Sequence, residues 1–196
     1  MKDWKIFFLL SLISLFGLTA CEDTDEPGEY DNWQERNAEY IDSIAVVARA
    51  NADGSWKVIL DTGLDESKIH GNEYYIYCKV LESGNGTEHP ASTDSVQVNY
   101  SGHLIPSKSY PNGFKFDSSY EGELEPEFDV PMGFVLSGTV PGFSKAVQNM
   151  VAGDIWRVYI PENLGYGAEA SSGVPAYSAL IFDINLVSFT PVSAVK

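Results

Sequence analysis

The chain has 196 residues, of which 44% are apolar and 20% are charged, so it can bury a core and is neither disordered nor collagen-like. Acidic residues outnumber basic residues by 28 to 12, a formal charge of -16, which argues against a nucleic-acid-binding protein because such proteins neutralise phosphates with Lys and Arg. The length suits one domain with short extensions, and 2 cysteines are too few for a disulfide framework.

The N-terminus has the pattern of an export signal. Lys2 and Lys5 precede an almost unbroken apolar run over residues 6–18, shorter than the roughly 20 residues that span a bilayer. The run ends in LTAC at residues 18–21, which resembles a bacterial lipobox. Residues 1–20 are therefore predicted to be a lipoprotein signal peptide and Cys21 the lipidated residue, with an ordinary secretory signal as the alternative.

A lipidated Cys21 implies a protein anchored in the bacterial cell envelope, with the outer membrane favoured. Residues 21–30 are acidic and contain Pro and Gly, which predicts a flexible tether. The acidic residues also resemble the signal that directs lipoproteins to the cell surface in some Gram-negative bacteria, and both interpretations stay open.

Residues 31–50 carry a helical pattern. Asp31 is a candidate N-cap with Gln34 at the reciprocal position, and the helix is expected to end near the NADG of residues 51–54. Its apolar face is predicted to contain Trp33, Asn37, Tyr40, Ile41, Ile44, Val47 and Ala48. The helix either docks on the domain that follows, which is favoured and implies a monomer, or forms the seam of a dimer.

The rest of the chain is rich in strand patterns. Gly84 to Gly86 is typical of a turn, and residues 105–113 of a loop. One short helix is expected from Pro141, through the apolar positions 143, 146, 147 and 150, to a stop at Gly153. Strands are expected at residues 56–60, 74–81, 96–101, 155–160 and 180–186. Antiparallel strands around a single short helix make an α+β fold.

Five segments in this region resemble, in order, the FKBP-type peptidyl-prolyl isomerases. They are VNYSG at 98–102, FDSS at 116–119, VPGF at 140–143 with the helix that follows, IP at 160–161 with LGYG at 164–167, and GVP at 173–175 with LIFDI at 180–184. The resemblance covers roughly residues 72–190. It implies a five- to six-stranded antiparallel sheet curled around one short helix, here preceded by the N-terminal helix.

This resemblance divides the chain into five parts. They are a signal peptide at 1–20, a tether at 21–30, a helix with a connecting segment at 31–71, an isomerase domain at 72–190 and a tail at 191–196. The implied activity is cis-trans isomerisation of proline-containing segments in exported polypeptides, without a cofactor or a metal.

The chemistry of that activity needs few polar groups. Resonance makes a prolyl peptide bond resist rotation by about 18–20 kcal/mol. A dry site that fits the twisted bond better than either planar isomer lowers this barrier without a nucleophile.

Eight positions match site residues of the family: Tyr100, Phe116, Asp117, Val140, Phe143, Tyr166, Val174 and Phe182. Tyr100, Phe116 and Phe182 are implied as aromatic walls of a prolyl pocket and Phe143 as its floor. Taken alone, Tyr100 and Phe182 are typical core residues of strands, and the order of the segments favours the site.

The remaining positions supply polar contacts and the rim. The resemblance implies that the backbone N–H of Val140 binds a substrate carbonyl and that Tyr166 offers its hydroxyl to another. Val174 closes the rim, and Asp117 is the one carboxylate of the site. An Asp here can also accept hydrogen bonds from the backbone around Ser118 and Ser119.

The chain departs from the family pattern at three places. The floor is Phe143 where active members commonly have Trp, the loop at 105–115 is long, and residues 120–136 are expanded, with Phe128 as the expected wall. The smaller floor favours a second hypothesis, a prolyl-binding chaperone or adaptor with little catalysis. A third hypothesis is a surface lipoprotein whose 11 Tyr bind glycan or a partner.

Other clusters are interpreted as structural. His70, His89 and His103 lack the spacing of a zinc site, and the alternating Glu residues at 121–127 lack that of a calcium loop. Cys78 lies in an apolar strand and is expected to be a buried, inert thiol.

Overall fold

The computed structural model describes residues 28–171 and 173–192. The predicted signal peptide, the lipidated Cys21 and most of the predicted tether lie outside the described residues, as do residues 193–196 of the tail. No helix within the described part of the chain is both long enough and apolar enough to cross a membrane.

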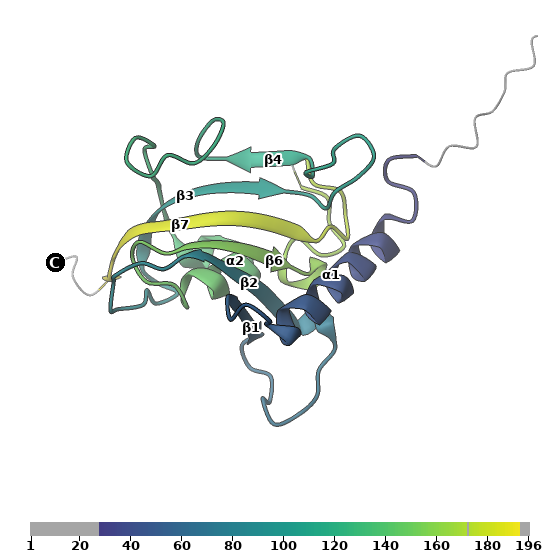
Figure 1. Cartoon of the computed structure of the whole chain (residues 1–196), viewed down its shortest axis with the longest axis horizontal. Helices are drawn as coiled ribbons and strands as arrows, with labels where there is room; N and C mark the ends of the chain where they lie inside the picture. Colours follow the sequence, from purple (N-terminus) through teal and green to yellow (C-terminus); the bar gives the residue numbers. More distant parts are fainter. Residues whose placement is uncertain (1–27, 172, 193–196) are drawn as a thin grey trace, which may run out of the picture.

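The described chain forms one antiparallel sheet with two α-helices, which confirms the expected α+β class (Figure 1). The helices are α1 (Trp33–Ala50) and α2 (Pro141–Val147), with single 3-10 turns at Asn72–Tyr74, Leu136–Gly138 and Glu162–Leu164. The strands are β1 (Trp56–Leu60), β2 (Tyr75–Glu82), β3 (Ser95–His103), β4 (Lys115–Ser118), β5 (Met132–Val135), β6 (Ile155–Ile160) and β7 (Leu180–Thr190).

The sheet has seven strands in the order β1-β2-β6-β7-β3-β4, and β5 also pairs with β3. β1 lies outside the region of family resemblance and extends the sheet beyond the five to six strands expected, because it pairs along its whole length with β2. The predicted strands at 56–60 and 155–160 have the bounds of β1 and β6. Since β1 belongs to the segment at 31–71, that segment and the domain after it share one sheet.

The core lies between the sheet and α2. Alternate residues of β7, Leu180, Phe182, Ile184 and Leu186, are 0–5% exposed, as the sequence alternation predicts. Phe143 and Ala146 of α2 are buried in the same cluster. Cys78 of β2 is also buried, which confirms the expected inert thiol, and burial raises the pKa of that thiol.

Helix α1 docks on the domain through one face. Trp33, Ile41, Ala45 and Ala48 are buried in the common core, and the Trp33 indole Nε1 donates to Ser178 Oγ at 2.8 Å. The docked arrangement is therefore the one present. Val47, predicted on this face, is 52% exposed because the buried positions 41, 45 and 48 point away from it around the helix.

The N-terminal cap of α1 differs from the expectation. The N-cap is Asn32 in a left-handed conformation without a side-chain capping bond, so the prediction of Asp31 and Gln34 as a capping pair is wrong. The Asp31 carboxylate instead accepts the N–H of Gly28 at 2.8 Å. At the end of the predicted tether, Glu29 accepts the hydroxyl of Ser109 at 2.6 Å, so this end is bound to the domain.

Two glycine predictions also need correction. Gly84 to Gly86 forms no turn and lies against residues 152–154. Gly84 N–H donates to Asp154 Oδ1, and a Cβ on Gly84 would meet Ala152 O at 2.2 Å. Gly153 does not end α2, which stops at Val147. Gly153 has φ 92° in the turn before β6, a conformation that favours glycine.

Candidate functional site

A cavity of about 450 Å³ opens on the side of the sheet that faces α2. It is lined by Tyr100, Asp117, Phe134, Val135, Gly138, Thr139, Val140, Phe143, Tyr166 and Phe182. Six of the eight positions singled out in the sequence thus come together around one opening, although they lie on β3, β4, β7, α2 and the loops beside them.

The floor and walls are aromatic rings packed at steep angles. The Phe143 ring, on a side chain 3% exposed, lies 5.2 Å from Phe182, 5.8 Å from Phe134 and 6.0 Å from Tyr100 between centroids. The Phe143–Phe182 pair has an interplanar angle of 82°, a favourable edge-to-face contact. These contacts hold the rings of the floor and the walls against one another.

Local sequence explains how the rings reach this position. Tyr100 and Phe182 occupy strand positions whose side chains point to the α2 side, and the two strands pair in antiparallel register. Pro141 begins α2, which places Phe143 in the first turn of the helix, facing the sheet.

One hydrogen bond links the aromatic wall to the carboxylate. The Tyr100 hydroxyl donates to Asp117 Oδ2 at 2.8 Å, while Asp117 Oδ1 accepts the Ser118 N–H at 2.9 Å. The second bond confirms the expected local role of Asp117. Burial and the neighbouring carboxylate both raise the pKa of Tyr100, so its hydroxyl stays protonated and a donor.

The opening of the cavity carries further polar groups. Val140 is the residue before α2, and no acceptor among the described residues takes its backbone N–H. Tyr166 is 39% exposed at the edge, on the turn that Gly167 N–H closes onto Glu162 O at 2.8 Å. The cavity therefore offers an apolar interior, one carboxylate, an N–H donor and a phenol at its rim.

Two of the eight sequence candidates do not line the cavity. The Phe116 ring contacts Phe182 edge-on at 5.6 Å and supports that wall. Val174 is 3% exposed beside Gly173, in a segment that folds back on itself through the Ser171–Val174 bridge.

The expected wall from the expanded segment is Phe134, and the prediction of Phe128 is wrong. Phe128 is 78% exposed and lies outside the cavity. Phe134 is on β5, opposite Val96 of β3, so its side chain shares the face of the strand that bears Tyr100. The sequence signal for it is the short apolar run at 132–136, which residues 137–139 separate from the VPGF motif.

In the described part of the chain, no group of three or more His, Cys, Asp or Glu side chains could hold a metal ion. The groups at the cavity suit the binding of a polypeptide segment with an apolar ring and at least one carbonyl.

Comparisons with known proteins agree with this geometry. A family model described as FKBP-type peptidyl-prolyl cis-trans isomerase matches residues 86–187. The chain is 40% identical over 111 residues to the peptidyl-prolyl cis-trans isomerase Mip of Coxiella burnetii, covering 56% of this chain and 43% of that protein. It is 34% identical over 111 residues to the outer membrane protein MIP of Legionella longbeachae, covering 56% and 42%. The chain thus spans less than half the length of these curated relatives.

A solved structure has the same fold. The crystal structure of a peptidyl-prolyl cis-trans isomerase from Pseudomonas syringae aligns with a TM-score of 0.55 and 26% sequence identity, covering 80% of this chain and 96% of that one.

Proposed function

The chain belongs to the FKBP-type peptidyl-prolyl cis-trans isomerases, and on that premise we propose that its aromatic cavity binds X-Pro segments of polypeptides and accelerates rotation about the prolyl bond. The observation that carries the proposal is the packing of Tyr100, Phe134, Phe143 and Phe182 around one opening with a single carboxylate. Such a cavity accepts a pyrrolidine ring and excludes water from the amide.

The cavity lowers the barrier by favouring the twisted amide. Rotation through 90° breaks the resonance between nitrogen and carbonyl, so the twisted amide is less polar than the planar one. The twisted amide therefore loses less hydration free energy when it moves from water into the cavity. Only interactions that are stronger in the twisted state raise the rate. Every tenfold acceleration corresponds to about 1.4 kcal/mol off the barrier.

Each polar group has a position in this proposal. The backbone N–H of Val140, which has no acceptor among the described residues, donates to a substrate carbonyl and fixes the chain on one side of the bond. Asp117, held by Tyr100 and by the Ser118 N–H, faces the carbonyl that turns, and Tyr166 binds a further carbonyl at the rim. Rotation about the bond needs no covalent step, and the Tyr100 hydroxyl that donates to Asp117 stays protonated because its pKa is raised.

The experiment is a protease-coupled isomerisation assay with proline-containing peptides on the full chain in mild detergent. We expect acceleration that the Tyr166→Phe variant lowers, since it removes one carbonyl contact at the rim. Rates equal to those in buffer, with the peptide still bound, would refute the isomerase proposal.

That outcome would support a second function, a prolyl-binding chaperone or adaptor. The observation in its favour is the floor, where Phe143 supplies a smaller surface than the Trp common in active members. Binding measured by peptide fluorescence anisotropy, beside the kinetic assay, separates the two.

We also propose that Cys21 carries a lipid that anchors the protein in the bacterial cell envelope. The support is the LTAC motif and the outer-membrane name of one relative. Two or more acyl chains are needed for stable anchoring, which a lipobox cysteine provides. Metabolic labelling with palmitate should mark the chain, and Cys21→Ala should abolish the label.

The proposed partners are proline-containing polypeptides and not nucleic acids, as the charge of -16 indicates. A monomer is favoured because the apolar face of α1 is buried in its own domain. Size-exclusion chromatography with light scattering should report the mass of one chain.

A further inference from the structure

A second cavity lies on the opposite face of the sheet. Its volume is about 620 Å³, larger than that of the prolyl cavity and within the range of about 300–1,000 Å³ typical of small-molecule sites. Ser101 and Asp183 line it, whereas their neighbours Tyr100 and Phe182 line the prolyl cavity, because successive side chains of a strand point to opposite faces. The two cavities therefore share a sheet and have no lining residue in common.

Strands β3, β6 and β7 form the floor of this second cavity, and α1 and two loops form its walls. The loops are the long segment before β4 and the segment after it, with Tyr120, Glu123 and Leu124. Figure 1 shows β3, β6 and β7 side by side, with α1 at one end of the sheet. All three strands have neighbours on both sides, so their backbone groups are paired within the sheet and offer no free edge to an incoming peptide.

The centre of the floor is a paired guanidinium and carboxylate. Arg157 Nε and Nη2 donate to Asp183 Oδ1 and Oδ2, each at 2.7 Å. Beyond this bidentate pair the guanidinium also interacts with the Tyr159 hydroxyl, and the guanidinium N–H groups and carboxylate lone pairs that remain lie near one plane. Donors and acceptors side by side in one plane match neighbouring hydroxyl groups.

The floor carries no net charge. The guanidinium of Arg157 and the carboxylate of Asp183 cancel, and burial lowers the pKa of His103, an effect that Arg157 and Lys115 reinforce and Asp183 opposes, so His103 is neutral at physiological pH. Glu123 stands exposed at the rim. An anionic ligand would meet this acidic rim without an unpaired cation, so the site favours an uncharged ligand.

Aromatic rings form the walls. The Tyr120 hydroxyl donates to Ser101 Oγ at 3.1 Å, which fixes the ring at the edge of the floor. On the other side, Tyr40 of α1 lies 6.3 Å from Tyr159, and Tyr159 stacks on Trp56 at 5.8 Å. Half-buried tyrosines bind flat, partly apolar ligands through the ring face and keep a polar edge.

We propose that this cavity binds an uncharged oligosaccharide. A sugar ring has apolar C–H faces and a rim of hydroxyls, so it can stack on Tyr120 while neighbouring hydroxyls bind the Arg157–Asp183 pair. A glycan-binding face opposite the prolyl cavity would hold the isomerase against a glycan while the other face acts on polypeptides.

The test is saturation-transfer difference NMR and calorimetry on the full chain in mild detergent. The probes are the trisaccharides chitotriose, cellotriose, maltotriose and mannotriose, a uronic acid trisaccharide as the anionic comparator and a proline-rich decapeptide. We expect at least one uncharged trisaccharide to bind at millimolar concentration. Binding of none of the four would overturn the proposal.

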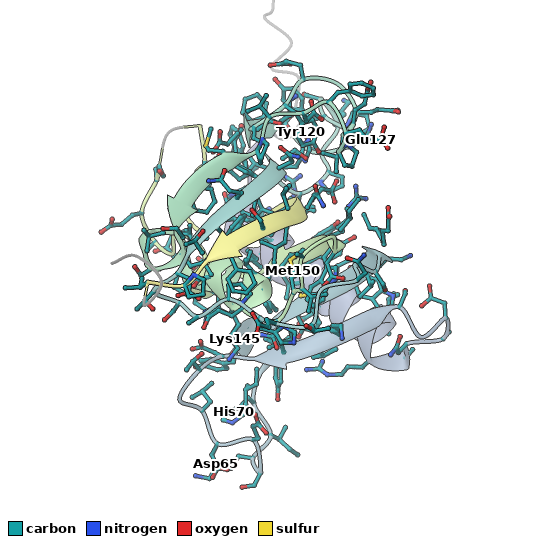
Figure 2. The ribbon with its side chains drawn as sticks, turned by 90° about the vertical axis from the view of Figure 1, so that its left-hand side faces the viewer. Asp65, His70, Tyr120, Glu127, Lys145 and Met150 are labelled. Carbon is teal, nitrogen blue, oxygen red and sulfur yellow. The ribbon has the colours of Figure 1, made fainter. Side chains whose placement is uncertain are left out.

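Variants locate the binding. Tyr120→Ala should weaken binding about tenfold or more, whereas Tyr120→Phe, which keeps the ring, should keep the affinity within about threefold. Asp183→Asn should weaken binding because it breaks the bidentate pair. The matched control is Tyr74→Ala, since the Tyr74 ring lies 6.1 Å from His70, which Figure 2 places at the end of the molecule opposite Tyr120.

Two further outcomes would contradict the proposal. The first is a bound trisaccharide whose affinity is the same in Tyr120→Ala as in Tyr74→Ala. The second is the uronic acid probe or the decapeptide binding with Tyr120 dependence while the uncharged sugars do not. Isomerisation rates measured on the same samples are independent of these results, so a failure of either proposal is recognised by itself.

Discussion

The Tyr100→Phe substitution isolates one hydrogen bond of the proposed site. It removes the hydroxyl that donates to Asp117 Oδ2 at 2.8 Å and keeps the ring, which contacts Phe134, Phe143 and Phe182 at 6.0–6.2 Å. The shape of the cavity is therefore preserved, and the carboxylate keeps only the Ser118 N–H as a partner.

The expected loss of stability depends on how exposed the Tyr100–Asp117 hydrogen bond is. A hydrogen bond to a charged group contributes about 1.5–3 kcal/mol, and because Asp117 is exposed, water replaces the lost donor in part. We expect a loss of about 1 kcal/mol in the free energy of unfolding. For catalysis, a carboxylate free to rotate should lower kcat/KM about five- to tenfold, close to the same energy.

The assay is protease-coupled isomerisation, with urea unfolding of the same samples to separate activity from stability. Asp117→Asn is the partner variant, because it keeps the shape and removes the charge. If the two residues act as a unit, the double variant should lose little more than the stronger single variant. A kcat/KM for Tyr100→Phe within about twofold of the unmodified chain, or full additivity in the double variant, would refute the coupled role of the two residues.

Three other predictions follow from particular residues. Phe134→Ala should lower kcat/KM about tenfold or more because it opens one wall of the cavity, whereas Phe128→Ala, on an exposed side chain, should leave it unchanged; equal effects would contradict the wall assignment. Phe143→Trp should raise kcat/KM at unchanged peptide affinity, because the small Phe floor limits the rate. An unchanged kcat/KM in this variant would contradict that limit. His103 has a lowered pKa in the fold, so the unfolded chain binds the proton more readily and the free energy of unfolding should fall as the pH drops below about 6.5. Urea titrations at several pH values should show a smaller fall for His103→Gln than for the unmodified chain. The same pH dependence in both proteins would contradict this role of His103.

Local sequence patterns predicted most of the secondary structure. Alternation of apolar and polar residues determined the strand at 180–186, and Trp56–Leu60 and Ile155–Ile160 have the predicted bounds because each is a short apolar run bounded by polar residues, Gly or Pro. The helical spacing of residues 33–48 predicted α1 and its docked face, with Val47 as the exception. Local patterns failed where long-range contacts decide the conformation. Gly84 to Gly86 has the composition of a turn, yet it forms none and instead packs closely against residues 152–154, which the absence of side chains on the two glycines allows.

For the site, the motifs identified the family and most of the residues around the cavity, because each motif has its residue at a position that the strand or helix period places on the same side of the sheet. The choice of Phe134 over Phe128 as the wall became clear only in the folded chain, since it depends on which part of the expanded segment pairs with β3. The pairing of Arg157 with Asp183, in the cavity that Tyr120 also lines, was likewise not predictable from the sequence. A side-chain pair across two strands depends on their register, which no local pattern encodes.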